Sequence, residues 1–320
     1  MKKIDVISIG AALVDMIAKV ERFPLDDDEV FVSDLKMLSG GAAANTAAAC
    51  SILGLNTAFI GKLGQHDEFG TKIIKDFERV SVKTDYIKYS DQYNTGSAYV
   101  ALNKQNKSRR IFAHSGAANY LSKTDIKEEE LTTAKLIYLS SLKNLSPFIE
   151  AGKIGQKNGI PVILNPGMLI IEQKFDKIKD LLQYIDILIL SRREYATLLN
   201  LKNNEFSEQI YIDKSEELKK LGIRIVIITL GKKGALLIYE DQSIITPPIE
   251  IDKIADTTGA GDAFSAGFMY GYLLMKDLTF KNLIKCVKIG NFVAGNCIQR
   301  LGARNGIPSQ KEVEEFQKKF

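Results

Sequence analysis

The chain has little of the chemistry that disulfide-bonded and metal-binding proteins use. Its 320 residues include three cysteines and two histidines. Cys50, Cys286 and Cys297 are too few and too scattered for a disulfide framework or a zinc knuckle. This cysteine usage favours a reducing compartment, and we expect a cytoplasmic protein. So few histidines argue against a multi-histidine metal site, which makes carboxylates the favoured candidates for acid–base chemistry.

The chain also lacks the long runs that mark membrane spans and nucleic-acid binding. No uncharged apolar stretch reaches the roughly 18 residues that a transmembrane helix needs. Asp5 and Asp15 interrupt the apolar N-terminal run, which argues against a secretory signal. The net charge of +4 comes without a dense Lys/Arg block, so we expect no nucleic-acid partner. No repeat or proline-rich linker divides the sequence, and we treat residues 1–320 as a single domain.

Short apolar runs dominate the chain after about residue 130, with helical segments between several of them. The runs are residues 134–141, 160–166, 185–190, 223–231 and 234–239. Strands buried on both faces have this composition when they lie in a parallel sheet flanked by helices. The sequence therefore predicts a doubly wound α/β fold with a mostly parallel sheet. Ligands bind such folds beyond the carboxyl ends of the strands.

The first third of the chain begins the same pattern and then departs from it. Residues 4–10 and 57–64 are predicted strands, and residues 42–54 form an alanine-rich helix. A second helix is predicted over residues 67–80, with Asp67 as its N-cap. "TGSAYVALN" and "RRIFAHSG" then predict a β-hairpin around the polar turn "KQNKS".

The stretch "DTTGAGDAFSAGFMYG", from Asp256 to Gly271, carries the strongest chemical signal. A glycine-rich turn precedes an apolar, small-residue helix, and Asp262 lies where that helix begins. Glycines let a ligand approach the backbone, and unpaired amides at a helix N-terminus bind anions such as phosphate. A carboxylate beside such a site is a candidate general base for phosphoryl transfer to an alcohol. The alternative is that Asp262 only stabilises the helix N-terminus.

This stretch resembles the C-terminal signature of the ribokinase-like (PfkB) carbohydrate kinases, a family that includes nucleoside kinases. "GGAAANTAAACSILG" resembles the family's N-terminal signature, and "GAALVD", "LGQHDEFG", "ILNP" and "TLGKKGAL" follow the family's order. The resemblance implies a ribokinase-like fold in which Asp262 deprotonates the acceptor hydroxyl. It also implies that the amides of Gly259, Ala260 and Gly261 form the anion hole for the transferred phosphoryl group.

The same resemblance implies the binding residues on both sides of that hole. Asp15 and Asn45 would bind substrate hydroxyls, and Gly40 and Gly41 would form a hinge. Thr229, Gly231 and Gly234 would line the nucleotide, with Asn291 near its adenine. Each has a structural alternative: Asp15 as a turn cap, Asn45 as a helix cap, Thr229 and Gly231 as turn residues, and Asn291 as a solvated helix residue.

Metal binding is implied on the same grounds. Family members carry N-x-x-E after a central strand, whereas this chain has "SRRE", with Ser191 in place of the asparagine. We expect Glu194 to contact Mg²⁺ through water and Ser191 to assist, or Glu194 to be only a helix-start carboxylate. A K⁺ site would use Asp256 and the backbone of several residues: Thr258, Cys297, Arg300, Gly302 and Gly306.

The family also has a small β-sheet lid, which residues 16–39 and 93–115 would build here, and paired lids would form a homodimer. Arg109, Arg110 and His114 would lie near the substrate mouth, where an arginine could contact a substrate phosphate or belong to a solvated hairpin. We expect an ATP- and Mg²⁺-dependent sugar kinase, with a nucleoside kinase as the alternative. Leu13 replaces a polar position of ribokinases and favours an acceptor with an apolar part. A catalytically silent nucleotide or sugar sensor is a third reading, which an intact Asp262 argues against.

Overall fold

The computed structural model describes residues 3–106, 108–201 and 207–319. Its centre is an eight-stranded sheet in the order β14-β13-β12-β11-β10-β9-β1-β4. The strands from β4 to β12 in this order run parallel, and β13 and β14 are added antiparallel at one edge. Their bounds are β1 Ile4–Gly10, β4 Thr57–Ile60, β9 Ala134–Ser140, β10 Val162–Asn165, β11 Ile187–Ser191, β12 Ile225–Thr229, β13 Ala235–Tyr239 and β14 Gln242–Thr246. The predicted doubly wound, mostly parallel sheet is confirmed.

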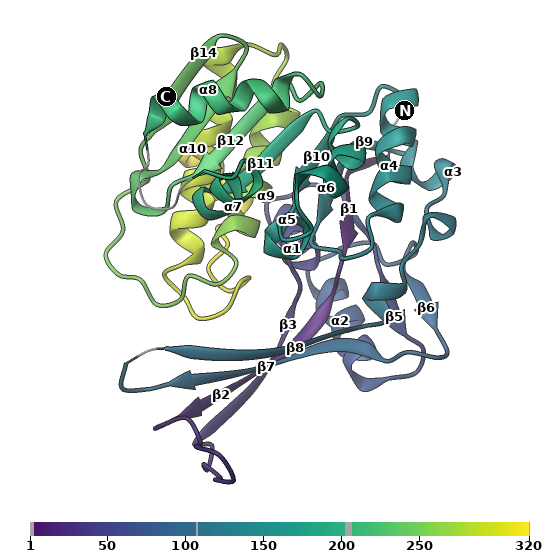
Figure 1. Cartoon of the computed structure of the whole chain (residues 1–320), viewed down its shortest axis with the longest axis vertical. Helices are drawn as coiled ribbons and strands as arrows, with labels where there is room; N and C mark the ends of the chain where they lie inside the picture. Colours follow the sequence, from purple (N-terminus) through teal and green to yellow (C-terminus); the bar gives the residue numbers. More distant parts are fainter. Residues whose placement is uncertain (1–2, 107, 202–206, 320) are drawn as a thin grey trace.

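Helices cover both faces of this sheet (Figure 1). Neighbouring residues of β1 enter different cores: Ile7 packs with α4, α6, α7 and α8, whereas Val6 packs with α1, α9, α10 and α11. This alternation is what a strand buried on both faces requires. The helices are α1 Ala42–Ile52, α2 Glu68–Arg79, α3 Glu128–Leu131, α4 Ser146–Lys157, α5 Gly167–Ile171, α6 Phe175–Leu182, α7 Arg192–Leu198, α8 Glu208–Lys219, α9 Ala260–Leu274, α10 Phe280–Cys297 and α11 Gln310–Gln317. Short 3₁₀ segments span Ala117–Tyr120, Lys123–Asp125 and Gly231–Lys233.

A separate four-stranded sheet, which we call the lid sheet, extends from the main body (Figure 1). Its order is β3-β2-β7-β8, with β2 Leu13–Val20, β3 Asp34–Gly40, β7 Thr95–Asn103 and β8 Arg109–Gly116. β7 and β8 form the predicted antiparallel hairpin, and Lys107 in its turn lies outside the described residues. Its strands come from residues 13–40 and 95–116, compared with the segments 16–39 and 93–115 expected to build a lid, and the role of this sheet as a lid stays a prediction.

The prediction of one strand over residues 57–64 is wrong. β4 ends at Ile60 in the large sheet, and β5 (Lys62–Gly64) pairs with β6 (Lys88–Ser90) in a third, two-stranded sheet. Gly61 separates them, and a Cβ there would lie 2.7 Å from the carbonyl oxygen of Gly10. β14 was not predicted from the sequence. The described residues hold no helix long and apolar enough to cross a membrane.

Candidate active site

The candidate site lies where the loop of residues 256–259 enters α9. Gly259 is the N-cap of α9 and has a left-handed backbone with φ +78°, which favours glycine. A Cβ on Gly259 would lie 2.4 Å from the Cβ of Ala303, whereas one on Gly261 would meet open space. No side chain caps α9. The Ala260 amide donates to the Thr257 carbonyl oxygen at 3.3 Å, whereas the first-turn amide of Gly261 has no partner within the helix and can face a ligand. This geometry is that of an anion site at a helix N-terminus.

Asp262 stands in the first turn of α9, half-buried beside these amides. Burial raises the pKa of Asp262 to about 6, the hydrogen bond from Asn45 and the charge of Arg304 lower it, and Glu194 and Asp15 raise it. A carboxyl with a pKa near the working pH suits a general base, because it is ionised and can still take a proton.

Asn45 and Arg304 hold the carboxylate in place. The Asn45 side chain, on α1, donates from Nδ2 to Oδ2 of Asp262 at 2.9 Å. Arg304 in turn donates from Nε to Oδ1 of Asn45 at 2.9 Å. Asn45 is 5% exposed, so it is a buried residue of α1 as well as a hydrogen-bond partner of Asp262. Arg304 is the residue that the sequence analysis missed; its only signal was a cation inside the glycine-rich "LGARNG".

Asp15 and the glycine pair lie on the lid side of the same site. Asp15 is half-buried in β2, burial raises its pKa to about 6, and the charge of Arg304 lowers it. A Cβ on Gly40 would lie 2.2 Å from Oδ2 of Asp15, so this glycine leaves the space that the carboxylate occupies. Gly41 has φ +93°, and a Cβ there would lie 2.4 Å from the carbonyl oxygen of Ala11. The structure thus brings Asp15, Gly40 and Gly41 together with Asn45.

Ser191 and Glu194 form a capping box at the start of α7. The Ser191 hydroxyl accepts from the Glu194 amide at 3.3 Å, and Oε2 of Glu194 accepts from the Ser191 amide at 2.7 Å. Glu194 therefore does have the role of a helix-start carboxylate that the sequence offered as the alternative to Mg²⁺ binding. Glu194 still acts electrostatically on Asp262, which places its carboxylate near the site. Among the described residues no three His, Cys, Asp or Glu side chains cluster to hold a metal, so Mg²⁺ would need nucleotide phosphates and water as its main ligands.

The residues assigned to the nucleotide gather at the ends of β11, β12 and β14. Thr229 pairs with Ser191 across β12 and β11. A Cβ on Gly234 (φ +86°) would lie 2.0 Å from the Thr246 carbonyl oxygen, whereas Gly231 (φ +60°) faces open space. Asn291 is 7% exposed and donates from Nδ2 to the carbonyl oxygens of Thr246 and Pro247, at 3.1 and 2.8 Å. It is therefore a buried residue that fixes the end of β14, not a solvated one.

The Asp256 carboxylate organises the loop beside the anion site. Oδ1 accepts from the amide and hydroxyl of Thr258 at 2.9 and 2.7 Å, and Oδ2 accepts from the Gly302 amide at 2.9 Å. Burial would raise the pKa of Asp256, but these hydrogen bonds outweigh it and hold the pKa below its usual value.

Carbonyl oxygens cluster next to this loop. The Cys297 thiol lies 3.9 Å from the Thr258 carbonyl oxygen and 3.4 Å from that of Ala303. Gly306 packs against the Cys297 carbonyl, where a Cβ would lie at 2.4 Å, and the Arg300 amide donates to that carbonyl at 3.4 Å. These carbonyl oxygens and the Asp256 carboxylate are therefore gathered in one region beside the start of α9.

One lid arginine reaches the site. Nη1 of Arg109, at the start of β8, lies 3.5 Å from the Thr258 hydroxyl and is exposed. Arg110 instead stacks over Phe23 at 4.5 Å, and His114 pairs with Ser97 on β7. The lid sheet therefore brings Arg109 to the mouth of the site, and the stacking engages Arg110 within the lid.

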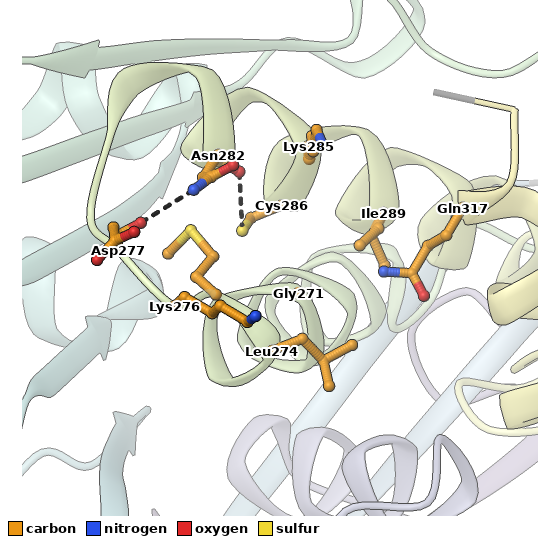
Figure 2. A pocket seen from close by; sticks show the side chains of 10 residues that line it. Gly271, Leu274, Lys276, Asp277, Asn282, Lys285, Cys286, Ile289 and Gln317 are labelled. Carbon is orange, nitrogen blue, oxygen red and sulfur yellow. Dashed lines mark hydrogen bonds between the residues drawn. The ribbon is translucent and has the colours of Figure 1, made fainter.

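Other hollows in the surface are separate from Asp262. One of them, drawn in Figure 2, lies at the far end of α9 and is lined by Leu274, Lys276, Lys285 and Cys286 among others. Its volume is about 380 Å³. Cys286 there donates to the Asn282 carbonyl oxygen at 3.2 Å, and burial raises the pKa of its thiol to about 12. A thiol held protonated in this way is unreactive. Two further hollows flank α2 near His66 and Asp67, and Asp67 caps α2 as predicted.

Comparison with known proteins shows the family and the fold of the chain. An uncharacterised sugar kinase from Archaeoglobus fulgidus is 34% identical over 260 residues, 81% of this chain and 97% of that protein. A nucleoside kinase from Methanocaldococcus jannaschii is 24% identical over 311 residues, 97% of this chain and 96% of the other. The structure of Arabidopsis thaliana ribokinase complexed with ribose and ATP superposes with a TM-score of 0.86 at 27% identity, covering 98% of this chain and 99% of that one. Residues 3–310 match the pfkB family carbohydrate kinases, so the chain belongs to this family of phosphotransferases, whose acceptor is an alcohol group.

Proposed function

We propose that the chain transfers the γ-phosphate of ATP to a hydroxyl of a sugar, with Asp262 as the general base. The observation that carries this proposal is the placement of Asp262, which is half-buried, bonded to Asn45 and adjacent to the uncapped first turn of α9. Asp262 takes the proton of the acceptor hydroxyl while the amides of Gly259, Ala260 and Gly261 stabilise charge on the transferring phosphoryl group. Asp15 and Asn45 orient the acceptor between the lid sheet and α1.

Residues named above would also hold Mg²⁺ and the nucleotide. Glu194 would reach Mg²⁺ through water, because its Oε2 already accepts from Ser191. Ser191 would contribute a hydroxyl to the same water shell, and Thr229, Gly231 and Gly234 would line the nucleotide. Asn291 would support this nucleotide side by holding the end of β14. Magnesium, when bound, supplies neutralisation of phosphate charge.

Potassium would bind near Asp256, with the carbonyls of Thr258, Cys297, Arg300, Gly302 and Gly306 as the remaining candidates. Turnover in K⁺, Na⁺ and cation-poor buffers tests this site. Higher turnover in K⁺ is expected, and equal turnover in all three buffers would count against a cation at this position.

A nucleoside kinase is the second candidate, because the inner face of the lid sheet carries three apolar side chains next to one another, with Lys36 of β3 at the end of their row. Strand register places Ile17, Val100 and Ile111 in one row, and alternation along β2 puts Ile17 on the same face as Asp15. An apolar row beside a hydroxyl-binding carboxylate suits a ligand that combines a nucleobase with a ribose.

An acceptor panel distinguishes these functions. We expect ATP-dependent phosphorylation of at least one of ribose, fructose and ribose phosphates, measured by coupled ADP release with product identified by mass spectrometry. Turnover of adenosine, inosine or cytidine alone would select the nucleoside kinase. Nucleotide binding without turnover of any acceptor would indicate a non-catalytic sensor.

Substitution of the proposed base is the second test. Asp262→Asn should lower kcat by about 10²-fold or more, because general bases contribute this much. ATP binding, followed by calorimetry, should remain, because the amides of the α9 turn do not depend on the carboxylate. Wild-type turnover in this variant would refute the assignment.

We also propose that the outer face of the lid sheet forms a homodimer interface. Register places Met37, Met16, Tyr99 and Phe112 in one row across all four strands. Met37 is 45% and Phe112 68% exposed, which is unusual for large apolar side chains unless a partner covers them.

A further inference from the structure

Arg304 is a charged side chain placed deep in the site without a full set of partners. Its Nε donates to Asn45, whereas its Nη2 is buried and has no hydrogen-bond partner among the described residues. The guanidinium also lies over the Phe77 ring at 5.6 Å. Leaving a buried donor unpaired costs on the order of 1–3 kcal/mol, so a fold-stabilising role alone does not explain this cation.

We propose that Arg304 is a positioning residue for the general base, and that it acts through the side-chain amide of Asn45. The inference rests on the proposed function of Asp262. Arginine only donates hydrogen bonds and an ionised carboxylate only accepts them. With Arg304 on one side and Asp262 on the other, the Asn45 amide has one favourable orientation, its oxygen toward Arg304 and its nitrogen toward Asp262.

This orientation determines what Asp262 can do. Nδ2 of Asn45 bonds to Oδ2, which leaves Oδ1 of the carboxylate for the proton of the acceptor hydroxyl. An amide nitrogen cannot accept a proton, so its hydrogen bond favours the ionised form of Asp262. Without Arg304 the amide could rotate by half a turn and present its oxygen to the carboxylate, which favours the protonated and inactive form.

The charges that face Asp262 come from several elements. Arg304 lowers the pKa of Asp262, while Glu194 from α7 and Asp15 from β2 raise it. Burial lowers the pKa of Arg304 itself to about 10, and Asp76 from α2, Asp262 and Asp15 oppose that effect, so Arg304 is charged at neutral pH. Arg304 is thus the cation that offsets the acids around the base.

Two substitutions separate charge from geometry. Arg304→Gln should lower kcat about tenfold, part of the contribution of a general base, and should shift the acid limb of kcat/KM to higher pH by about one unit. The sign is upward because the base must be ionised and the lost cation favoured that ionised form. Arg304→Lys keeps the charge but not the planar donor, so kcat should fall while the acid limb stays near its wild-type position.

A double-mutant cycle tests the path through Asn45. If Arg304 acts by orienting that amide, Asn45→Ala combined with Arg304→Gln should lose no more kcat than Asn45→Ala alone. Arg224→Gln is the matched control, because it removes an equal charge from an exposed residue. Arg224 lies just before β12, at the end of that strand away from Thr229. Losses that multiply, or an acid limb that Arg304→Gln leaves unmoved, would overturn the proposal.

A titration without turnover keeps this test separate from the proposed function. Protein carrying ¹³C-carboxyl aspartate is followed by NMR, and Asp262→Asn identifies the resonance by its loss. The Asp262 midpoint should lie near 6 in the wild type, stay near that value in Arg304→Lys, and be higher in Arg304→Gln. Equal midpoints in folded variants would refute the inference even if the acceptor remained unknown, whereas failure of the acceptor panel alone would refute only the kinase assignment.

Discussion

The burial of Asp262 carries a cost in stability that its proposed role as general base explains. In the unfolded chain an aspartate ionises near its usual pKa of 3.8, whereas the folded protein raises the pKa of Asp262 to about 6. A raised carboxyl pKa favours the folded state at low pH, and this contribution is lost as the pH rises through about 4 to 6. Above that range the ionised, desolvated carboxylate destabilises the fold. The proposed function and stability therefore oppose each other at this residue.

We predict that Asp262→Asn stabilises the protein at pH 7.5 by about 1–2 kcal/mol, the order expected for a carboxyl whose pKa is raised in the folded state. At pH 4.5 the gain should be clearly smaller. Urea unfolding at both pH values measures the difference, and the exposed Asp26→Asn is the control. A gain that is equal at both pH values, or absent, would contradict the raised pKa of Asp262.

The junction between β3 and α1 shows how one element serves the site. Gly40 has no left-handed backbone, so an alanine there is compatible with the chain, but its Cβ would lie 2.2 Å from the Asp15 carboxylate. Gly10, at the end of β1, differs: a Cβ there would lie 2.1 Å from the Ser140 carbonyl oxygen, and its φ is +158°. A side chain can move aside, whereas a buried backbone carbonyl cannot.

We therefore predict that two glycine substitutions affect different properties, acceptor binding in one and stability in the other. Gly40→Ala should displace Asp15 and raise the acceptor KM about tenfold, as expected for losing a charged hydrogen bond, with little change in melting temperature or in the KM for ATP. Gly10→Ala should lower the melting temperature by several degrees, on the scale of a ΔΔG of about 1–3 kcal/mol. A Gly40→Ala protein that melts early but binds its acceptor normally would contradict this division.

Sequence reasoning located most of these elements because their patterns are local. Alanine density predicted α1, continuous apolar runs predicted β9 to β13, and the hairpin of β7 and β8 followed from its polar turn. The break at Gly61 was missed, because it depends on the backbone of Gly10 from another strand. Arg304 was missed for a similar reason: its partner Asn45 is 259 residues away in sequence. Motifs supplied the candidate site residues, whose roles stay predictions, but only the folded chain shows which of them touch.

At the scale of the whole molecule, the two faces of the lid sheet have different surroundings. The face that carries Asp15 turns toward the active site, and Arg109 reaches the Thr258 hydroxyl from the same sheet. The opposite face carries the row from Met37 to Phe112 and is not covered by the rest of the chain at either end of that row. Two edge strands, β3 and β8, also bound the sheet, and exposed edges favour association.

We predict that the chain forms a dimer through this outer face. Sedimentation equilibrium over the micromolar range should give twice the chain mass of 35.5 kDa, and Phe112→Ser with Met37→Ser should return the mass of one chain. Leu274→Ser is the control, because Leu274 is 55% exposed but lies at the far end of α9. If dimerisation supports the lid, the monomeric variant should also show a raised acceptor KM, since the inner face borders Asp15. A wild type that stays monomeric, or a dimer unaffected by both lid substitutions, would show that this apolar row has no partner of its own kind.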